Sequence, residues 1–158
     1  LEYLQPDKAF LKIGYKAFAT KKTEFNAAMS YVLNNAVGGI APNFTVDYAN
    51  ALLSRGSLSK ALNPTTDLAT AGQASFSWDD NSLEGNANAT DKAMVLVYNA
   101  SKKESMYILD GAIRTAGSQT VTLPGTYAGD TVELFIAFVS ADGTQVSNSL
   151  YLGSGTAA

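Results

Sequence analysis

The sequence predicts an α+β protein that is mainly β: an N-terminal segment with two short helices, followed by an antiparallel β-sandwich. Two observations predict this class. Apolar residues recur at helical spacing in the first forty residues, whereas from residue 74 onward short strands alternate with turn residues about every 8–12 positions. The length of 158 residues fits one domain, or one domain with an appended subdomain.

The first forty residues predict two helices. Asp7–Ala19 carries a broad apolar stripe, although Gly14 weakens it by roughly 1 kcal/mol relative to alanine. Thr23 is a suitable N-cap for a second helix over Glu24–Ala36, and Gly38-Gly39 would end it. Two short helices cannot bury their apolar faces alone, so they are expected to lie on the rest of the protein or on a neighbour.

After the helices the hydrophobic period changes to that of strands. Phe44–Tyr48 alternates apolar and polar residues, and Ala51–Ser54 and Leu58–Leu62 are weaker strand signals. Residues 63–73 are rich in Thr, Ala, Asn and Gly and predict a linker or long loop. The expected organisation is therefore a helical segment with one or two strands over 1–62, a linker over 63–73 and a sandwich over 74–158.

The sandwich region contains six further strand signals. Val132–Val139 is the strongest of them, and Ala93–Val97 is continuously apolar, as expected for a central strand covered on both faces. The six predicted strands are Ala74–Trp78, Ala93–Tyr98, Ser105–Leu109, Thr120–Leu123, Val132–Val139 and Val146–Leu152. The side chains expected in their core are Trp78, Val95, Val97, Leu134 and Ile136.

Three features of this region resemble a fibronectin type III domain, one of the Ig-like sandwiches. They are Phe76–Asp79 with its Trp, the corner Leu123–Tyr127, and the long strand Val132–Val139 followed by the turn 140–143. The resemblance implies a Trp beneath the sheet and a tyrosine corner before the long strand. The sequence departs from the pattern at Tyr127, where Ala-Gly-Asp intervenes before the strand, which questions its corner role.

The whole chain also resembles a family of uncharacterised proteins from Bacteroidota. The similar stretches are Phe25–Tyr31, Pro42–Phe44, Ser54–Leu58, Phe76–Asn81 and Asn148–Gly153. Members of that family carry a Gly-rich segment ahead of the point where this chain begins, and the first residue here is Leu1 rather than Met. This start indicates a processed form or a fragment. The resemblance implies a fold more than an activity.

The composition argues against the common kinds of chemistry. The sequence has no histidine and no cysteine, so the usual general base, thiol nucleophile and transition-metal ligands are missing. No nucleotide-binding glycine motif occurs. We therefore expect no enzyme, no catalytic residues and no cofactor. Nucleic acid is not an expected partner, because the basic residues form no dense stripe, and no apolar run is long enough to span a membrane.

One cluster of oxygen-bearing side chains could bind a hard cation. Asp79, Asp80, Asn81 and Glu84 lie within six positions, and calcium accepts such ligands. Their spacing differs from that of an EF-hand loop, and Asx residues are frequent in turns without metal. Turn formation is therefore the favoured interpretation, and no metal site is expected.

Charge is unevenly distributed along the chain. Residues 1–60 carry seven basic and four acidic residues, a net charge of +3, whereas residues 61–158 carry four basic and ten acidic residues, a net charge of −6. We expect a non-enzymatic structural subunit, at the cell surface or outside the cell, that self-associates and polymerises into a filament by strand complementation. The alternative is a monomeric module that binds glycan or protein through the loops at the sandwich ends, 79–92 and 110–119.

Overall fold

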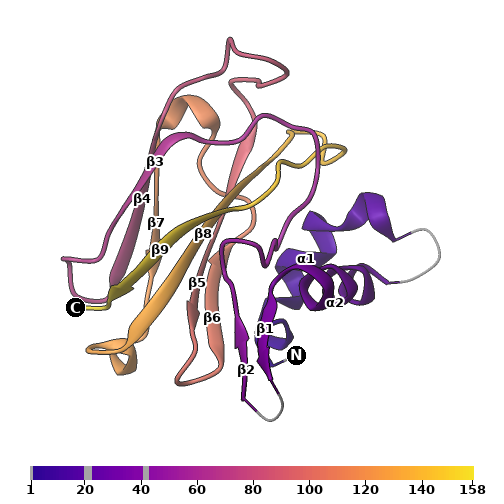
Figure 1. Ribbon diagram of the computed structural model, residues 1–158. Helices are drawn as coiled ribbons and strands as arrows, with labels where there is room; N and C mark the ends of the chain where they lie inside the picture. The colour runs from indigo at the N-terminus through magenta and orange to yellow at the C-terminus, as the bar shows by residue number, and fades with distance from the viewer. Residues whose placement is uncertain (1, 20–22, 41–42) are drawn as a thin grey trace.

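The computed structural model describes residues 2–19, 23–40 and 43–158, and it has three layers (Figure 1). A three-stranded sheet and a four-stranded sheet form the sandwich. Helices α1 (Lys8–Gly14) and α2 (Glu24–Asn35), with the hairpin of β1 (Val37–Ile40) and β2 (Asn43–Val46), lie on one side of it. The structure thus confirms the α+β, mainly β class.

The helical segment follows the predicted pattern with shorter elements. Thr23 caps α2 as expected, since its Oγ1 accepts a hydrogen bond from the backbone N–H of Asn26 at 3.1 Å. The first predicted helix is divided: short 3₁₀ helices at Gln5–Asp7 and Lys16–Phe18 flank α1. The division falls at Gly14, where a Cβ would lie 2.3 Å from the carbonyl oxygen of Leu53. The glycine allows the helix to approach the following segment closely.

Both sheets of the sandwich are antiparallel. The three-stranded sheet has the order β3-β4-β7, and the four-stranded sheet has the order β6-β5-β8-β9. The bounds of these seven strands are β3 Leu62–Asp67, β4 Gln73–Asp79, β5 Lys92–Asn99, β6 Glu104–Ile108, β7 Ser118–Thr122, β8 Thr131–Val139 and β9 Leu150–Thr156. The predicted fibronectin type III-like sandwich is confirmed by this arrangement.

The linker predicted over 63–73 is wrong in its first half. Leu62–Asp67 forms the edge strand β3, paired with β4, and only the residues after Asp67 form a loop. Its sequence carries no apolar alternation because the strand is only half-buried, and Pro64 is tolerated because an edge strand leaves N–H groups unpaired. Val37–Ile40 also forms a strand, although its two glycines predicted only the end of the preceding helix.

Other strands also differ in position from the prediction. Ala51–Ser54 and Leu58–Leu62 are not strands, apart from the first residue of β3, although Leu58 forms a single bridge to Ser147. The last predicted strand lies four residues further along, at β9. Its glycines are weak strand formers, but tertiary packing selects this segment, because Leu68 lies where a Cβ on Gly155 would be.

The four-stranded sheet is buried on both faces and so separates two cores. Between the two sheets lie all five predicted core residues: Trp78, Val95, Val97, Leu134 and Ile136. The opposite face of the same sheet, with Leu96, Tyr98 and Phe135, packs against Phe10, Leu11 and Val32 of the helical segment. The helices therefore complete the burial of β5 and β8.

Tyr127 departs from the tyrosine corner, as its surrounding sequence suggested. The residue is buried, and its hydroxyl donates a hydrogen bond to Glu104 Oε2 at 3.3 Å, on strand β6. The contact therefore joins the corner after β7 to a strand of the other sheet.

Hydrogen bonds between side chains and backbone join residues 53–54, which follow the helices, to residues 147–149 of the sandwich. Leu53 N–H donates to Ser149 Oγ at 2.9 Å, and Ser54 Oγ donates to the carbonyl oxygen of Ser147 at 2.6 Å. A Cβ on Gly56 would lie 2.1 Å from the carbonyl oxygen of Val146, so only glycine fits there without a shift of the backbone. Residues 53–56 and 146–149 are therefore in direct contact, and this contact holds the helical segment on the sheet.

A buried carboxyl group in the helical segment gives a testable pH dependence. Asp7 is fully buried, accepts a hydrogen bond from Ser105 Oγ, and has its pKa raised by burial to about 7. The folded protein therefore holds a proton between about pH 4 and 7 that the unfolded chain releases, so the free energy of unfolding falls as the pH rises through this window. The fall should be on the order of 4 kcal/mol.

Urea unfolding of Asp7→Asn at pH 4.5 and pH 8 checks this expectation. Asparagine mimics the protonated carboxyl, so the variant should be about as stable as the wild type at pH 4.5 and clearly more stable at pH 8. Asp142→Asn is the control: hydrogen bonds from Ser140 and Thr144 hold the pKa of Asp142 at about 2, so its contribution is constant across the window. Equal pH dependence of wild type and Asp7→Asn would contradict the assignment.

Candidate functional site

The residues weighed as calcium ligands lie at the end of β4 and in the loop that follows it, but they do not converge. Asp79 Oδ2 accepts a hydrogen bond from Asn63 Nδ2 at 3.0 Å, and Asp80 Oδ1 accepts one from the N–H of Ser82 at 2.9 Å. Glu84 is exposed. Among the residues that the structure describes, no three acidic, histidine or cysteine side chains come close enough to hold a metal ion. Asp80 thus makes a contact within the turn, whereas Asp79 contacts strand β3.

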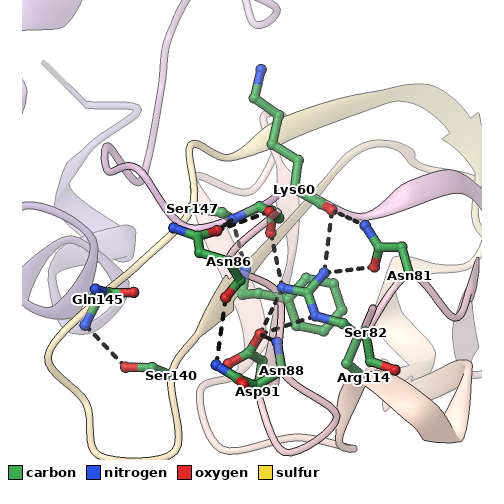
Figure 2. Close-up of polar contacts among 12 residues, drawn as sticks. Lys60, Asn81, Ser82, Asn86, Asn88, Asp91, Arg114, Ser140, Gln145 and Ser147 are labelled. Carbon is green, nitrogen blue, oxygen red and sulfur yellow. Dashed lines mark hydrogen bonds and ion pairs between the residues drawn. The ribbon is translucent and has the colours of Figure 1, made fainter. Parts of the chain in front are cut away.

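Asn81, the remaining residue of that cluster, belongs to a buried polar network around Arg114 that the sequence analysis did not predict. Arg114 has no exposed surface, and it pairs with Asp91, whose Oδ2 accepts hydrogen bonds from Nε at 3.0 Å and lies 2.9 Å from Nη2 (Figure 2). The guanidinium also lies 4.1 Å from the ring centroid of Phe138. This is a fully desolvated ion pair with a cation–π contact on one face.

The same guanidinium holds two distant segments of the chain. Its Nη1 donates to Asn81 Oδ1 at 2.8 Å and to the carbonyl oxygen of Lys60 at 3.2 Å, and its Nη2 donates to the carbonyl oxygen of Ser59 at 2.9 Å. Asn81 Nδ2 in turn donates to the Lys60 carbonyl at 3.1 Å. The start of the β4–β5 loop is thereby fastened to the segment that leads into β3.

A second asparagine fastens the far side of this loop. Asn86 Oδ1 accepts hydrogen bonds from the N–H and the hydroxyl of Ser59, both at 2.8 Å, and Asn86 Nδ2 donates to the carbonyl oxygen of Ser57 at 3.0 Å. Figure 2 shows both asparagines reaching back from the loop toward the chain around Lys60. The loop is therefore held at two points, and the residues between them are presented in a defined conformation.

Ser82, Leu83 and Glu84 lie between these two points, and the exposed Asp79 and Asp80 come directly before the first of them. We call Asp79, Asp80, Ser82, Leu83 and Glu84 the acidic loop tip. Leu83 is 101% exposed, a higher fraction than that of any other large apolar side chain in the described residues. Hydrogen bonds from Ser82 hold the pKa of Asp80 below its usual range, so this carboxylate is ionised at neutral pH. The tip thus combines one fully exposed apolar residue with three acidic residues that are close to it in the chain.

A concave surface of opposite charge lies beside α1. Two adjoining cavities of about 300 and 320 Å³ share Ile13, Lys16 and Gly143 as lining residues. The first is completed mainly by Arg55 and Val146, and the second by Lys12 and Glu24. We call these two cavities the basic cleft. Its walls come from the helical segment on one side and from the turn between β8 and β9 on the other.

Arg55 is held rigidly at the edge of this cleft. Its guanidinium carbon lies 4.3 Å from the ring centroid of Phe18 and 4.2 Å from that of Tyr31. Stacking between two rings orients the guanidinium without neutralising its charge. The arrangement suits recognition of a carboxylate.

The sequence contained only part of this site. The positive balance of residues 1–60 was noted without predicting a cleft, and Asp79, Asp80, Asn81 and Glu84 were recognised as a group. Nothing in the sequence paired Asp91 with Arg114, because 23 positions separate them and the fold alone brings them together. The stacking of Arg55 between two aromatic rings had no local signal either.

No helix among the described residues has the length and apolar character needed to cross a membrane.

The fold and the surfaces define a fibronectin type III-like sandwich with an attached helical unit and two surfaces of opposite charge. By sequence, residues 1–153 match the model of a family of unknown function (DUF6266), and the chain belongs to that family. The predicted resemblance to an uncharacterised family is thus confirmed.

A comparison with solved structures finds a likeness in fold. The solution structure of the fn3 domain of the human collagen alpha-1(XX) chain is similar to 66% of this chain and 91% of its own, with 17% sequence identity and a TM-score of 0.45. No match was found among curated proteins.

Proposed function

We propose that this protein is a non-enzymatic structural subunit that associates with further copies of itself at the cell surface or outside the cell. The observation that supports this proposal is the presence of two opposite surfaces on one chain: the protruding acidic loop tip and the concave basic cleft. A protrusion that fits a cavity elsewhere on the same molecule leads to assembly of identical subunits. The lack of histidine and cysteine in the sequence favours a non-catalytic role.

The mode of association favoured by the fold is surface contact. Neighbouring strands of both sheets are hydrogen-bonded without a gap, in the orders β3-β4-β7 and β6-β5-β8-β9. A strand donated by another copy would therefore add at a sheet edge, where unpaired backbone groups are available, instead of filling a gap in the sandwich. Filament formation by strand complementation accordingly remains a proposal for the edges of the sheets.

Self-association is tested on the full chain at several concentrations and salt levels. We expect species larger than the monomer by size-exclusion chromatography with light scattering, and polymers by negative-stain microscopy, at low ionic strength. Because charged contacts contribute, assembly should weaken at 1 M salt, where the Debye length falls to about 3 Å. A strictly monomeric protein at high concentration and low salt would refute the proposal.

A second candidate function is binding of glycan or protein at the sandwich end. A polar cavity of about 320 Å³ lies between residues 88–91 and the turn 140–145, and Asn88, Asp91 and Gln145 are among its lining residues. Figure 2 shows the N–H of Gln145 donating to Ser140 Oγ, a hydrogen bond of 3.0 Å within the turn. A glycan array, read with and without calcium, tests the carbohydrate version, and silence on all glycans would remove it.

A further inference from the structure

Leu83 has an unusual combination of exposure and fixation. Single exposed apolar residues are common on proteins, but most of their side chains lie partly against the surface. Leu83 is fully exposed at 101%, and the hydrogen bonds of Asn81 and Asn86 hold its loop on both sides. The loop therefore holds an apolar side chain in water without local compensation, in a conformation already fixed for binding.

The basic cleft has the matching properties. The half-buried Ile13 and the buried Val146 are among its lining residues. The exposed Lys12 and Lys16 and the stacked Arg55 stand around these apolar groups. Glu24 is the acidic group that also lines the cleft. An apolar centre with a mainly basic rim thus faces solvent on one part of the chain.

The acidic loop tip is complementary to the basic cleft both in charge and in having an apolar residue. Leu83 is its fully exposed apolar residue, and the exposed Asp80 and Glu84 lie within three positions of it in the chain. Lys60 lies near the base of the loop, and its side chain extends away from Asn81 and Arg114 in Figure 2. An exposed apolar side chain with acidic neighbours in the chain therefore matches a cleft that is lined by apolar and mainly basic side chains.

We propose that the acidic loop tip of one copy docks in the basic cleft of a second copy, with Leu83 between Ile13 and Val146. The carboxylates of Asp80 and Glu84 then lie against Lys16 and Arg55. This inference rests on the proposed function, since it names the contact through which the copies associate. The surface on one copy differs from that on the other, so the contact is heterologous, and it produces chains unless two copies bind each other reciprocally.

The first test replaces the central side chain. Leu83→Ser should raise the dissociation constant of self-association roughly 10- to 100-fold, as expected when the burial of one leucine is lost. The matched control is Leu33→Ser, the same change at a leucine of α2 that is 51% exposed and does not line the cleft. It should leave the constant unchanged. Thermal unfolding of both variants verifies that each is folded.

The second test uses two variants that are complementary. Leu83→Ser loses the tip and keeps the cleft, whereas Lys16→Glu loses the cleft and keeps the tip. Each alone should be mainly monomeric, and an equimolar mixture should form a 1:1 complex in sedimentation velocity without longer species. No other pair of surfaces predicts that two association-defective variants restore exactly one contact when mixed.

The outcomes separate this inference from the proposed function. If the wild type assembles and Leu83→Ser assembles equally well, the docking contact is wrong although the protein is still a self-associating subunit. The docking contact is also wrong if Leu33→Ser weakens association as much as Leu83→Ser, or if the mixture forms no complex. A wild type that is monomeric under all conditions overturns both.

Discussion

Arg114→Ala should lower the free energy of unfolding by about 3–5 kcal/mol, as is typical when one partner of a buried ion pair is removed. The guanidinium has no exposed surface, and Asp91, its partner, is only 1% exposed at the side chain. Without Arg114, the Asp91 carboxylate would remain buried with no opposite charge beside it. The carbonyl oxygens of Ser59 and Lys60 would also lose a donor.

Urea unfolding followed by the fluorescence of Trp78 measures this loss. Trp78 is the only tryptophan, and its Nε1 donates to the Arg114 carbonyl at 2.7 Å, so it reports on this end of the sandwich. Lys102→Ala is the control, since Lys102 pairs with Asp130 at 2.6 Å on the partly exposed surface. That change should cost at most about 1 kcal/mol.

A double-mutant cycle with Asp91→Asn adds the test of mechanism. If the cost of Arg114→Ala comes from the unpaired carboxylate, then the double variant should be less destabilised than the two single losses together. Additive losses, or a loss near that of Lys102→Ala, would contradict the assigned role of the network.

Phe135→Ala should destabilise the protein by about 3–5 kcal/mol and should do so in both parts of the chain together. Phe135 is 1% exposed on the face of β8 that contacts the helical segment, whereas Trp78 lies in the core between the two sheets. Both cores share β5 and β8, so a cavity on one face of the sheet weakens the strands that complete the other.

Two probes distinguish shared from separate unfolding. Far-ultraviolet circular dichroism at a helical wavelength follows the helical segment, and Trp78 fluorescence follows the sandwich. The two denaturation curves should coincide in the wild type and shift together in Phe135→Ala. Phe44→Ala, at a side chain that is 63% exposed, is the control and should change stability by no more than about 0.5 kcal/mol. A shift of the helical curve alone would show that residues 1–62 unfold independently.

How far the sequence specifies this fold depends on how strongly each element is patterned. Ala93–Tyr98 and Val132–Val139 were found correctly because a strand covered on both faces is continuously apolar. Edge strand β3 was missed because it is half-buried and polar, with a proline that reads as a break. The shift of β9 arises because packing around Gly155 outweighs local preference.

The sequence by itself determined the class of the fold and the inter-sheet core around Trp78, because these depend on the period of the apolar residues. Only the tertiary structure decided what surrounds them. It buried the second face of the four-stranded sheet beneath the helices, joined Asp91 to Arg114, and fixed the loop that carries Leu83. These contacts join residues far apart in the chain, and no local pattern records such a partner.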